Sequence, residues 1–486
     1  MKKGSVTIYM SMILAVLLSL FLTVIEGARS RAVSLRADCA FDLSVYSVFG
    51  EYNRCLYEEY GLFFIDTAYG ETKASLERTN RHLRYYMENN LDKNNSGAKL
   101  FDYTKCLVER TEITGCRYAT DEKGEVFEQQ AVEFMKHRYG ISYIEKLQKE
   151  LERAEDMGLF TRDFSGKREE SHAEIQKAEE EGIVVGTDEE TGEEIREKIK
   201  LDNPADAMNA ARKTGILLLV TGSDDVISGQ STDLSESVTR QKPKTKGFGE
   251  AEKASVSLTE RFWFDAYIAE MSGSYRNPKK TGCLQYQTEY VLAGKDSDAD
   301  NLKVVAERLL LLREVSNCIY LLSDAEKVAE ALTLATSICS VFGPEALVLA
   351  EPVKYTLLFA WAYAEAIYDV KQLLAGGEIP LVKSSATWHY SITGMLSSTA
   401  EDVSEESLEL CAGGLGYEEY LRLFLALEDH SQKVYRMMDI VQMDVRKKSE
   451  FENFYLSNCA DFLVMEAIVV SRYGYYKELK RKYSYI

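Results

Sequence analysis

MKKGSVTIYMSMILAVLLSLFLTVIEGARSR, residues 1–31, is the most informative stretch of this sequence. Between Lys3 and Glu26 it contains 22 residues without a charged side chain. A helix of that length spans about 33 Å, which matches the roughly 30 Å hydrocarbon core of a bilayer. The sequence therefore predicts that residues 1–27 form a membrane anchor.

A cleaved secretory signal is the alternative for this segment. The apolar run is longer than the core of about 7–15 residues that signal peptides have, and no small-x-small cleavage site follows it cleanly. Basic residues lie on both sides of the span: Lys2 and Lys3 before it, Arg29, Arg31 and Arg36 after it. The positive-inside balance is therefore close to even. We expect the large C-terminal part to lie outside the cytoplasm, because large regions are translocated regardless of flanking charge.

The apolar pattern continues beyond the span at spacings of three and four residues, which is typical of an amphipathic helix with one buried face. The residues concerned are Val33, Ala37, Phe41, Val45, Val48, Tyr52 and Leu56. We therefore expect one continuous helix from about residue 5 to Tyr60, with its first half in lipid and its second half against a folded head.

Composition excludes several classes of protein. The 486 residues include 58 basic and 78 acidic side chains, a net charge of −20, and 45% are hydrophobic. Such a chain can bury a core and is not disordered as a whole. Nucleic acid is excluded as a partner, because phosphate binding needs a basic surface. The sequence divides into the anchor (1–27), a long helix with an acidic helical and hairpin region (28–227), a polar linker or mobile loop (228–257) and an apolar α+β part (258–486).

The local patterns predict a predominantly helical α+β head. Two apolar runs, Leu309–Leu312 and Thr356–Ala364, are too short to cross a bilayer and are assigned to core helices. Helices are expected over 76–91, over 125–182 with a break near 160–166, and over 299–322, 324–341, 345–375, 417–428 and 431–448. Strands are expected over 102–118, 284–292 and 460–472, with a short hairpin over 182–192.

One acidic cluster has the spacing of a metal site. Asp296, Asp298 and Asp300 stand at positions 1, 3 and 5 of a calcium-binding loop, and Glu307 stands at position 12. However, the residues from Leu302 onward already have helical periodicity, and Asp side chains before a helix accept its first free N–H groups. We therefore expect helix capping here and no metal site, with calcium binding as the weaker alternative.

No catalytic or cofactor-binding motif is recognisable, and we expect neither an enzyme nor a cofactor. The five histidines are scattered, and the nine cysteines contain no C-x-x-C pair. Cys106 and Cys116 could bridge a hairpin, or they could be small buried side chains. A membrane-anchored cell-wall hydrolase, its site assembled from residues remote in sequence, is an alternative, and a scaffold facing the cytoplasm is another.

The N-terminus resembles type IV prepilins and the TadE and TadG pseudopilins of tight-adherence pili. Lys2-Lys3-Gly4 before an apolar helix is similar to a prepilin leader, which implies cleavage between Gly4 and Ser5. Prepilins carry a glutamate at the fifth position after the cut, where this chain has Tyr9. The resemblance implies an extracytoplasmic head and pilin-like or surface-assembly proteins as partners, in addition to the lipid bilayer.

A second resemblance covers most of the chain. It is to a family of uncharacterised, single-anchor proteins of Gram-positive bacteria, a domain of unknown function. The blocks that resemble it are GSVTIY (4–9), FGEYNRCLYEEYGLFFIDTAYG (49–70), EYVLAGKDSDADNLKVVAERLLLLREVSN (289–317), LLFAWAYAEAIYDVKQLLAGGEIPLVKS (357–384) and GLGYEEYLRLFLAL (414–427). The two resemblances together imply a membrane-tethered protein with a structural or assembly role at the cell surface.

Overall fold

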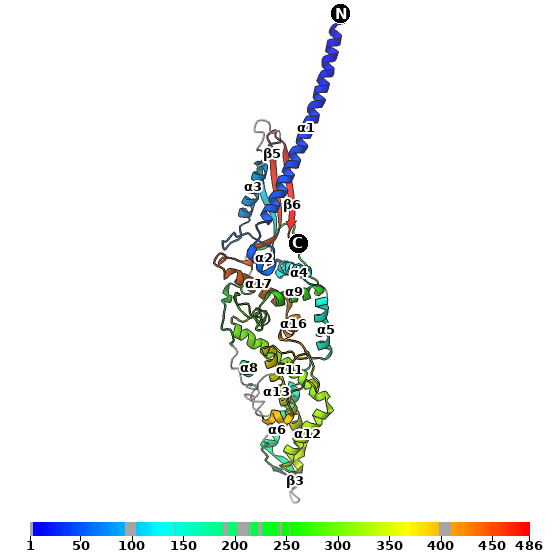
Figure 1. Ribbon diagram of the computed structural model, residues 1–486, viewed down its shortest axis with the longest axis vertical. Coiled ribbons are helices and arrows are strands. Elements are labelled where there is room, and N and C mark those ends of the chain that lie inside the picture. Colours follow the sequence, from blue (N-terminus) through cyan, green and yellow to red (C-terminus); the bar gives the residue numbers. More distant parts are fainter. Residues whose placement is uncertain are drawn as a thin grey trace. The chain divides into compact units, whose positions relative to one another are not determined.

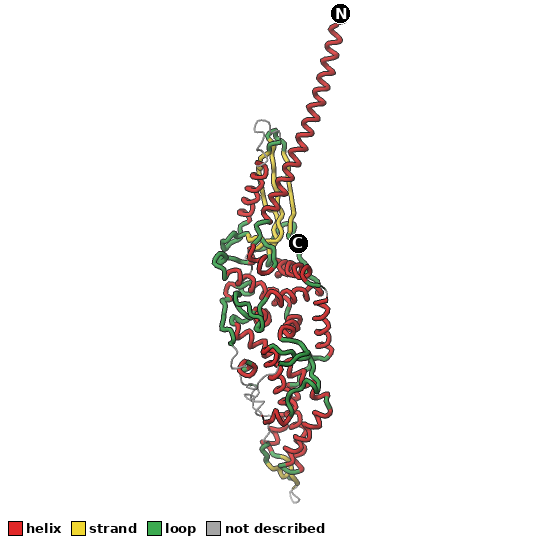
Figure 2. The backbone as a smooth tube through the Cα atoms, in the orientation of Figure 1, coloured by secondary structure: helices red, strands yellow, loops and turns green. Residues whose placement is uncertain are grey.

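The computed structural model describes residues 3–92, 104–140, 142–187, 193–201, 212, 215–221, 226–241, 243, 245–251, 253–397 and 410–486. Figure 1 shows the elements in chain order, and Figure 2 shows that helices predominate. The chain forms two compact units. Unit 1 comprises Met1–Arg138, Ser235–Phe264 and Met437–Ile486, and unit 2 comprises Tyr139–Leu234 and Asp265–Arg436.

Helix α1 (Lys3–Phe49) is the longest element of unit 1 and extends well beyond the rest of it (Figure 1). It contains both the apolar span and most of the amphipathic continuation. The expectation that it runs on to Tyr60 is wrong, because the helix ends at Phe49 and a new one, α2 (Arg54–Tyr60), begins five residues later. Asn53 explains the break: its extended backbone leaves the helix, and its side chain accepts a hydrogen bond from Leu56 N as the N-cap of α2.

The second half of α1 packs against an antiparallel sheet. The central strand β5 (Cys459–Ser471) pairs along one edge with β2 (Cys106–Tyr118), from Cys106 opposite Ser471 to Tyr118 opposite Ala460. Its other edge pairs first with the short β1 (Ile65–Asp66) and then with β6 (Tyr476–Ser484). Helices α1 and α3 (Leu76–Asp92) lie together on one face of this sheet (Figure 1).

The core of unit 1 lies between these two helices and the sheet. Alternate residues of β5 face the helices, as the two-residue period of a strand requires. The buried set includes Val33, Ala37, Phe41, Val45 and Val48 of α1, Leu83 and Met87 of α3, Val108 and Cys116 of β2, Leu463, Met465, Ala467 and Val469 of β5, and Leu479 of β6. The predicted buried face of α1 is therefore confirmed from Val33 to Val48.

The rest of unit 1 is mainly helical. It contains α4 (Glu125–Arg138) and the short 3-10 helices Asp121–Gly124 and Leu456–Asn458. The 3-10 helix Leu234–Glu236 lies in the stretch 228–257, where Thr239 Oγ1 donates a hydrogen bond to Asp439 Oδ2 at 2.6 Å. The boundary between the units falls within α9 (Leu258–Met271) and α17 (His430–Arg446).

Unit 2 is built around helix α13 (Ala350–Ala375), of which 23 of 26 residues are buried. A helix that is buried on all sides belongs in a core, which confirms the assignment made for Thr356–Ala364. The elements that accompany it are α5 (Ser142–Asp156), α6 (Ser165–Glu181), β3 (Ile183–Thr187), β4 (Glu194–Glu197), α8 (Ile216–Val220), α10 (Gln287–Ala293), α11 (Asp298–Ser323), α12 (Ala325–Ser340), the 3-10 helix Pro344–Leu349, α14 (Ile392–Ser397) and α16 (Tyr417–Leu427).

One local prediction is wrong, and one alternative that the sequence left open is decided. The strand expected over Leu284–Leu292 is in large part the helix α10, which ends at Gly294 in the left-handed conformation (φ 68°) that commonly terminates helices. Of the two alternatives for Cys106 and Cys116, the structure has buried side chains and no disulfide, because they lie ten residues apart on the single strand β2. An extended strand separates them by about 33 Å. The expected hairpin is confirmed in its described part, β3 and β4, and residues 188–192 lie outside the described residues.

Candidate functional site

The most distinctive surface of the protein is the first half of α1. Every described side chain from Val6 to Ala28 is exposed, and the large apolar ones from Val6 to Ile25 expose between 43% and 70% of their area. Among the described residues, this is the one helix long and apolar enough to cross a membrane. It fits a single-pass membrane anchor, although a signal sequence would pass the same test of length and composition.

The second half of α1 is fixed to unit 1 by charge as well as by apolar packing. Arg481 Nε on β6 donates to Asp42 Oδ1 at 2.6 Å, and Lys477 forms an ion pair with Asp38. Arg36 Nη1 donates to Thr104 Oγ1 at 2.9 Å on the other side of the helix. Acidic groups of α1 therefore face basic groups of β6, and the helix cannot rotate about its axis without losing these pairs.

A line of exposed side chains runs along the face of the same half of α1 that points away from the core, and at its end Tyr46 also contacts the ring of Tyr483 on β6, at 5.3 Å between centroids. Leu35, Leu43 and Tyr46 expose 66%, 56% and 58% of their area, and Cys39 is also exposed. At spacings of four, four and three residues these four side chains share one helix face. We call Leu35, Cys39, Leu43 and Tyr46 the outer stripe. Projected along the helix, it continues the line of Leu14, Leu18, Phe21 and Ile25 in the apolar segment.

A polar cluster lies just after the end of α1. Glu51 accepts a hydrogen bond from Tyr86 Oη at 2.6 Å and one from Tyr69 Oη at 2.9 Å, and His82 Nδ1 lies 2.9 Å from its Oε1. The hydrogen bond to Glu51 raises the pKa of Tyr86 to about 12. Burial raises the pKa of Tyr69 as well. Both tyrosines stay protonated at neutral pH, and the cluster joins the end of α1 to α3.

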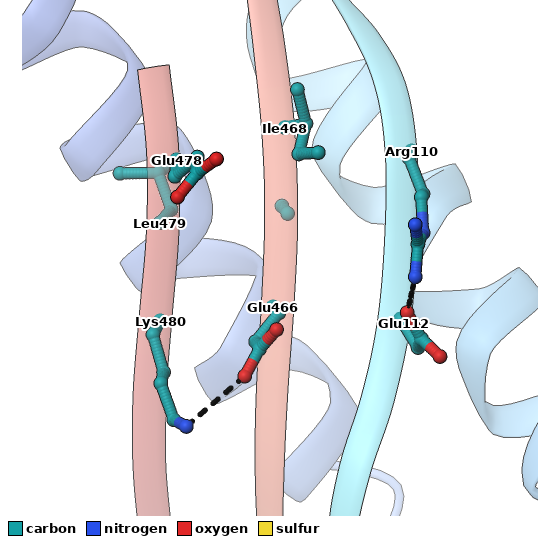
Figure 3. A pocket seen from close by; sticks show the side chains of 8 residues that line it. Arg110, Glu112, Glu466, Ile468, Glu478, Leu479 and Lys480 are labelled. Carbon is teal, nitrogen blue, oxygen red and sulfur yellow. Dashed lines mark hydrogen bonds and ion pairs between the residues drawn. The ribbon is translucent and has the colours of Figure 1, made fainter.

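The outer face of the sheet, opposite α1 and α3, carries a hollow of about 540 Å³ (Figure 3). Its charged side chains come from all three long strands; four of them form two ion pairs, and Glu478 accepts a hydrogen bond from Tyr476 Oη at 2.7 Å. Lys480 Nζ lies 3.1 Å from Glu466 Oε1, and Arg110 pairs with Glu112. This alternation of paired charges is typical of a solvated sheet face.

Unit 2 contains a buried ionic cluster beside a second cavity. Arg313 Nε donates to Asp369 Oδ2 at 3.0 Å, Lys383 Nζ lies 2.5 Å from Asp369 Oδ1, and Lys383 also pairs with Glu365. Glu365 accepts further hydrogen bonds from the backbone N–H groups of His389 (2.8 Å) and Tyr390 (2.9 Å).

Three of the four carboxylate oxygens of this cluster therefore accept hydrogen bonds, and the fourth, Asp369 Oδ1, is neutralised by the ion pair with Lys383. Burial raises the pKa of Glu365 against the attraction of Lys383. The neighbouring cavity of about 560 Å³ is lined by Tyr368, Trp388 and His389 among others, and the His389 ring is stacked on Tyr368 at 3.9 Å. No carboxylate of the cluster lines it. The arrangement favours a structural role over acid–base chemistry.

The acidic residues singled out in the sequence lie at the start of α11. Ser297 is the N-cap, and its side chain accepts a hydrogen bond from Asp300 N. The Asp298 carboxylate accepts hydrogen bonds from Ser228 Oγ at 2.7 Å and Tyr286 N at 3.0 Å. Asp296 and Glu307 are exposed. In the described part of the chain, no three His, Cys, Asp or Glu side chains are placed to hold one metal ion.

Gly4 and Ser5 lie in the first turn of α1, and cleavage between them stays a prediction. The hydrogen-bond partners of Glu51 were missed by the sequence analysis. Glu51 and Tyr69 fall in the block 49–70, but neither spacing nor composition connects them with Tyr86 and His82.

Comparison with known proteins gives one match. Residues 193–471, more than half of the chain, match a family described as a family of unknown function (DUF5702). Three of the sequence blocks quoted above lie within the matched range. No curated protein and no solved structure matches the chain.

Proposed function

The chain belongs to the DUF5702 family of unknown function, and from that premise and the structure we propose that it is a membrane-tethered assembly protein, similar in design to pseudopilins. In this proposal the first half of α1 lies in the bilayer, and its second half carries the folded units outside the cytoplasm. The outer stripe of α1 then packs against a helix of another copy. The observation that carries the proposal is the apolar line that continues from the span into the outer stripe.

Continuity of α1 supports the anchoring part. Its residues 3–49 form one uninterrupted helix, and its buried face begins at Val33, only eight residues after the apolar segment ends at Ile25. A cut after the span would fall inside this helix. Burial of about 22 apolar residues makes release from a bilayer effectively irreversible, so the helix is suited to permanent retention.

The outer stripe supports the assembly part. Soluble surfaces carry scattered apolar side chains, but here Leu35, Leu43 and Tyr46 are aligned on one face and lead directly into the membrane segment. A partner that covers both the stripe and the adjoining face of the span must itself be a helix that leaves the membrane at the same level. A second copy of α1 meets that requirement, because the outer stripes of two copies can face each other across a twofold axis.

Cys39 gives a direct test, because it is a native thiol at the centre of the outer stripe. Cys39 and Cys411 are the exposed thiols among the nine cysteines, so Cys411→Ser leaves Cys39 as the accessible one. We expect mild oxidation of membranes that contain the Cys411→Ser chain to give a disulfide-linked dimer. The dimer should disappear in the chain that also carries Cys39→Ser.

A matched control moves the thiol away from the stripe. Glu58 is exposed on α2, and Glu58→Cys in the chain with Cys39→Ser and Cys411→Ser should give no dimer under the same oxidation. If the Cys411→Ser chain stays monomeric in membranes, or if the Glu58→Cys control links equally well, the packing of one copy against another is contradicted. A disulfide-linked product whose mass differs from that of a dimer would show that the outer stripe packs against a helix of a different protein.

A further inference from the structure

The turn that joins β5 to β6 lies beside the point where α1 leaves its apolar segment. We call residues 472–476 the hairpin tip. The guanidinium of Arg29 lies over the ring of Tyr473, 3.8 Å from its centroid. Arg29 follows Ile25 by four residues, so for a helix along the membrane normal the tip is about 6 Å beyond the apolar segment. The headgroup layer on one side of a bilayer is about 5–7 Å thick.

The side chains of the tip suit that depth. Tyr473, Tyr475 and Tyr476 expose 48%, 44% and 52% of their area. Tyrosine is enriched at membrane–water interfaces, because its ring is apolar while its hydroxyl can remain hydrated. Three exposed tyrosines within four residues, at the level where the span ends, are the arrangement that an interfacial contact requires.

The tip is a fixed structure rather than a loose loop. Ser471 N donates to Tyr475 O at 2.7 Å, and Tyr475 N donates to Ser471 Oγ at 2.8 Å. Gly474 adopts a φ of 78°, which a residue with a side chain rarely does, and this closes the turn. Just after the tip, Lys477 pairs with Asp38, which holds the start of β6 against α1.

Exposed basic side chains lie around the tip, although the chain has a net charge of −20 and Tyr476 Oη of the tip donates a hydrogen bond to Glu478 at 2.7 Å. Arg31, Lys105 and Arg472 are exposed at this end of unit 1, and Arg472 N donates to Lys105 O at 3.1 Å. Two acids of α1 lie near the tip, and both are paired: Glu26 with Arg29 and Asp38 with Lys477. Basic side chains close to a bilayer are attracted to anionic headgroups.

We infer that the hairpin tip is a second membrane contact, which inserts its tyrosines among the headgroups of anionic lipids in the bilayer that α1 spans. The inference rests on the proposed function, since it needs α1 in the membrane. Its consequence is mechanical: one helix alone leaves unit 1 free to tilt, whereas a helix and a hairpin fix its orientation to the membrane surface.

The test uses the full chain in vesicles of phosphatidylglycerol with bromine atoms near the headgroup end of the acyl chains, which quench tryptophan on close contact. Tyr473→Trp adds an indole at the tip. Tyr57→Trp is the matched control, because Tyr57 is 43% exposed on α2, at the far end of the sheet from the tip (Figure 1). Emission of the parent chain, with its three native tryptophans, is subtracted from both. Flotation with the vesicles reports whether α1 holds the chain in the bilayer.

We expect the emission added by Tyr473→Trp to be lost in brominated vesicles, and the emission added by Tyr57→Trp to be kept. With Arg31→Glu and Arg472→Glu in the same chain, the loss at the tip should shrink while flotation is unchanged. A chain that floats with no loss at the tip, or with equal loss at both positions, overturns the inference and leaves the proposed function intact. A chain that does not float overturns both. Protection of the added indole without lipid, rising with protein concentration, would assign the tip to a second copy instead.

Discussion

Glu289 should make unit 2 less stable as the pH rises, whereas a carboxylate held in an ion pair has the opposite effect. It is fully buried on α10, and it accepts hydrogen bonds from Tyr417 Oη and Tyr275 N, each at 2.7 Å. Among the described residues its Oε2 has no hydrogen-bond partner. Burial, which penalises the charged form, raises the pKa of Glu289 to about 7.

The size and sign of the effect follow from proton linkage. Below about pH 4.5 the carboxyl is neutral in both the folded and the unfolded chain, so it costs nothing. Between about pH 4.5 and 7 only the folded chain holds the proton, so the free energy of unfolding falls by about 1.4 kcal/mol per pH unit. Over that interval of about 2.5 units, the loss reaches about 3 kcal/mol and is then constant.

Glu289→Gln should remove this dependence, because an amide has the shape of the protonated acid and keeps an acceptor for Tyr417 and Tyr275. Thermal unfolding of the full chain in detergent is the assay. We expect equal melting temperatures near pH 4.5 and a variant that melts about 6–12 °C higher at pH 8. Glu307→Gln, an exposed change on α11, is the control and should run parallel to the parent chain. If the melting temperature of Glu289→Gln also changes with pH in parallel with that of the parent chain, the reasoning is refuted.

Three further changes test other parts of the structure. Lys383→Met leaves two buried carboxylates without their shared cation and should cost about 3–5 kcal/mol in denaturant unfolding, and adding Glu365→Gln should recover part of that loss. Phe41→Ala empties a fully buried position on α1 and should cost about 3–5 kcal/mol, seen as faster hydrogen exchange in β5, while Leu43→Ala on the exposed face should cost less than about 0.5 kcal/mol. Calcium should not raise the melting temperature, because the Asp298 carboxylate already accepts protein hydrogen bonds, and a rise that a chelator reverses would contradict this placement.

The features that the sequence predicts well depend on local patterns. The 22 uncharged residues before Glu26 and the spacing from Val33 to Val48 determine α1, because each is a property of one continuous helix. The end of α1 could not be predicted, because apolar residues continue at spacings of three and four through Tyr52 and Leu56. Nothing in that pattern shows that Asn53 caps a new helix.

Features that depend on distant partners could not be predicted. Strand β6 was not expected, because YKELKRKYS (476–484) has the composition of a solvated surface. Lys477 and Arg481 of this strand form hydrogen-bonded ion pairs with Asp38 and Asp42, which lie more than 400 positions earlier in the chain. The same holds for the segment before Gly294, where a short apolar run fits a strand or a helix equally well until its packing against α11 is known.

Alkaline carbonate extraction of membranes from cells that express the full chain tests the central claim most directly. If the first half of α1 lies in the bilayer, the protein stays in the membrane pellet. Leu14→Arg with Leu18→Arg, each costing about 2.5–3.5 kcal/mol at the centre of a span, should move it toward the supernatant. Release of the unaltered chain into the supernatant would contradict the account.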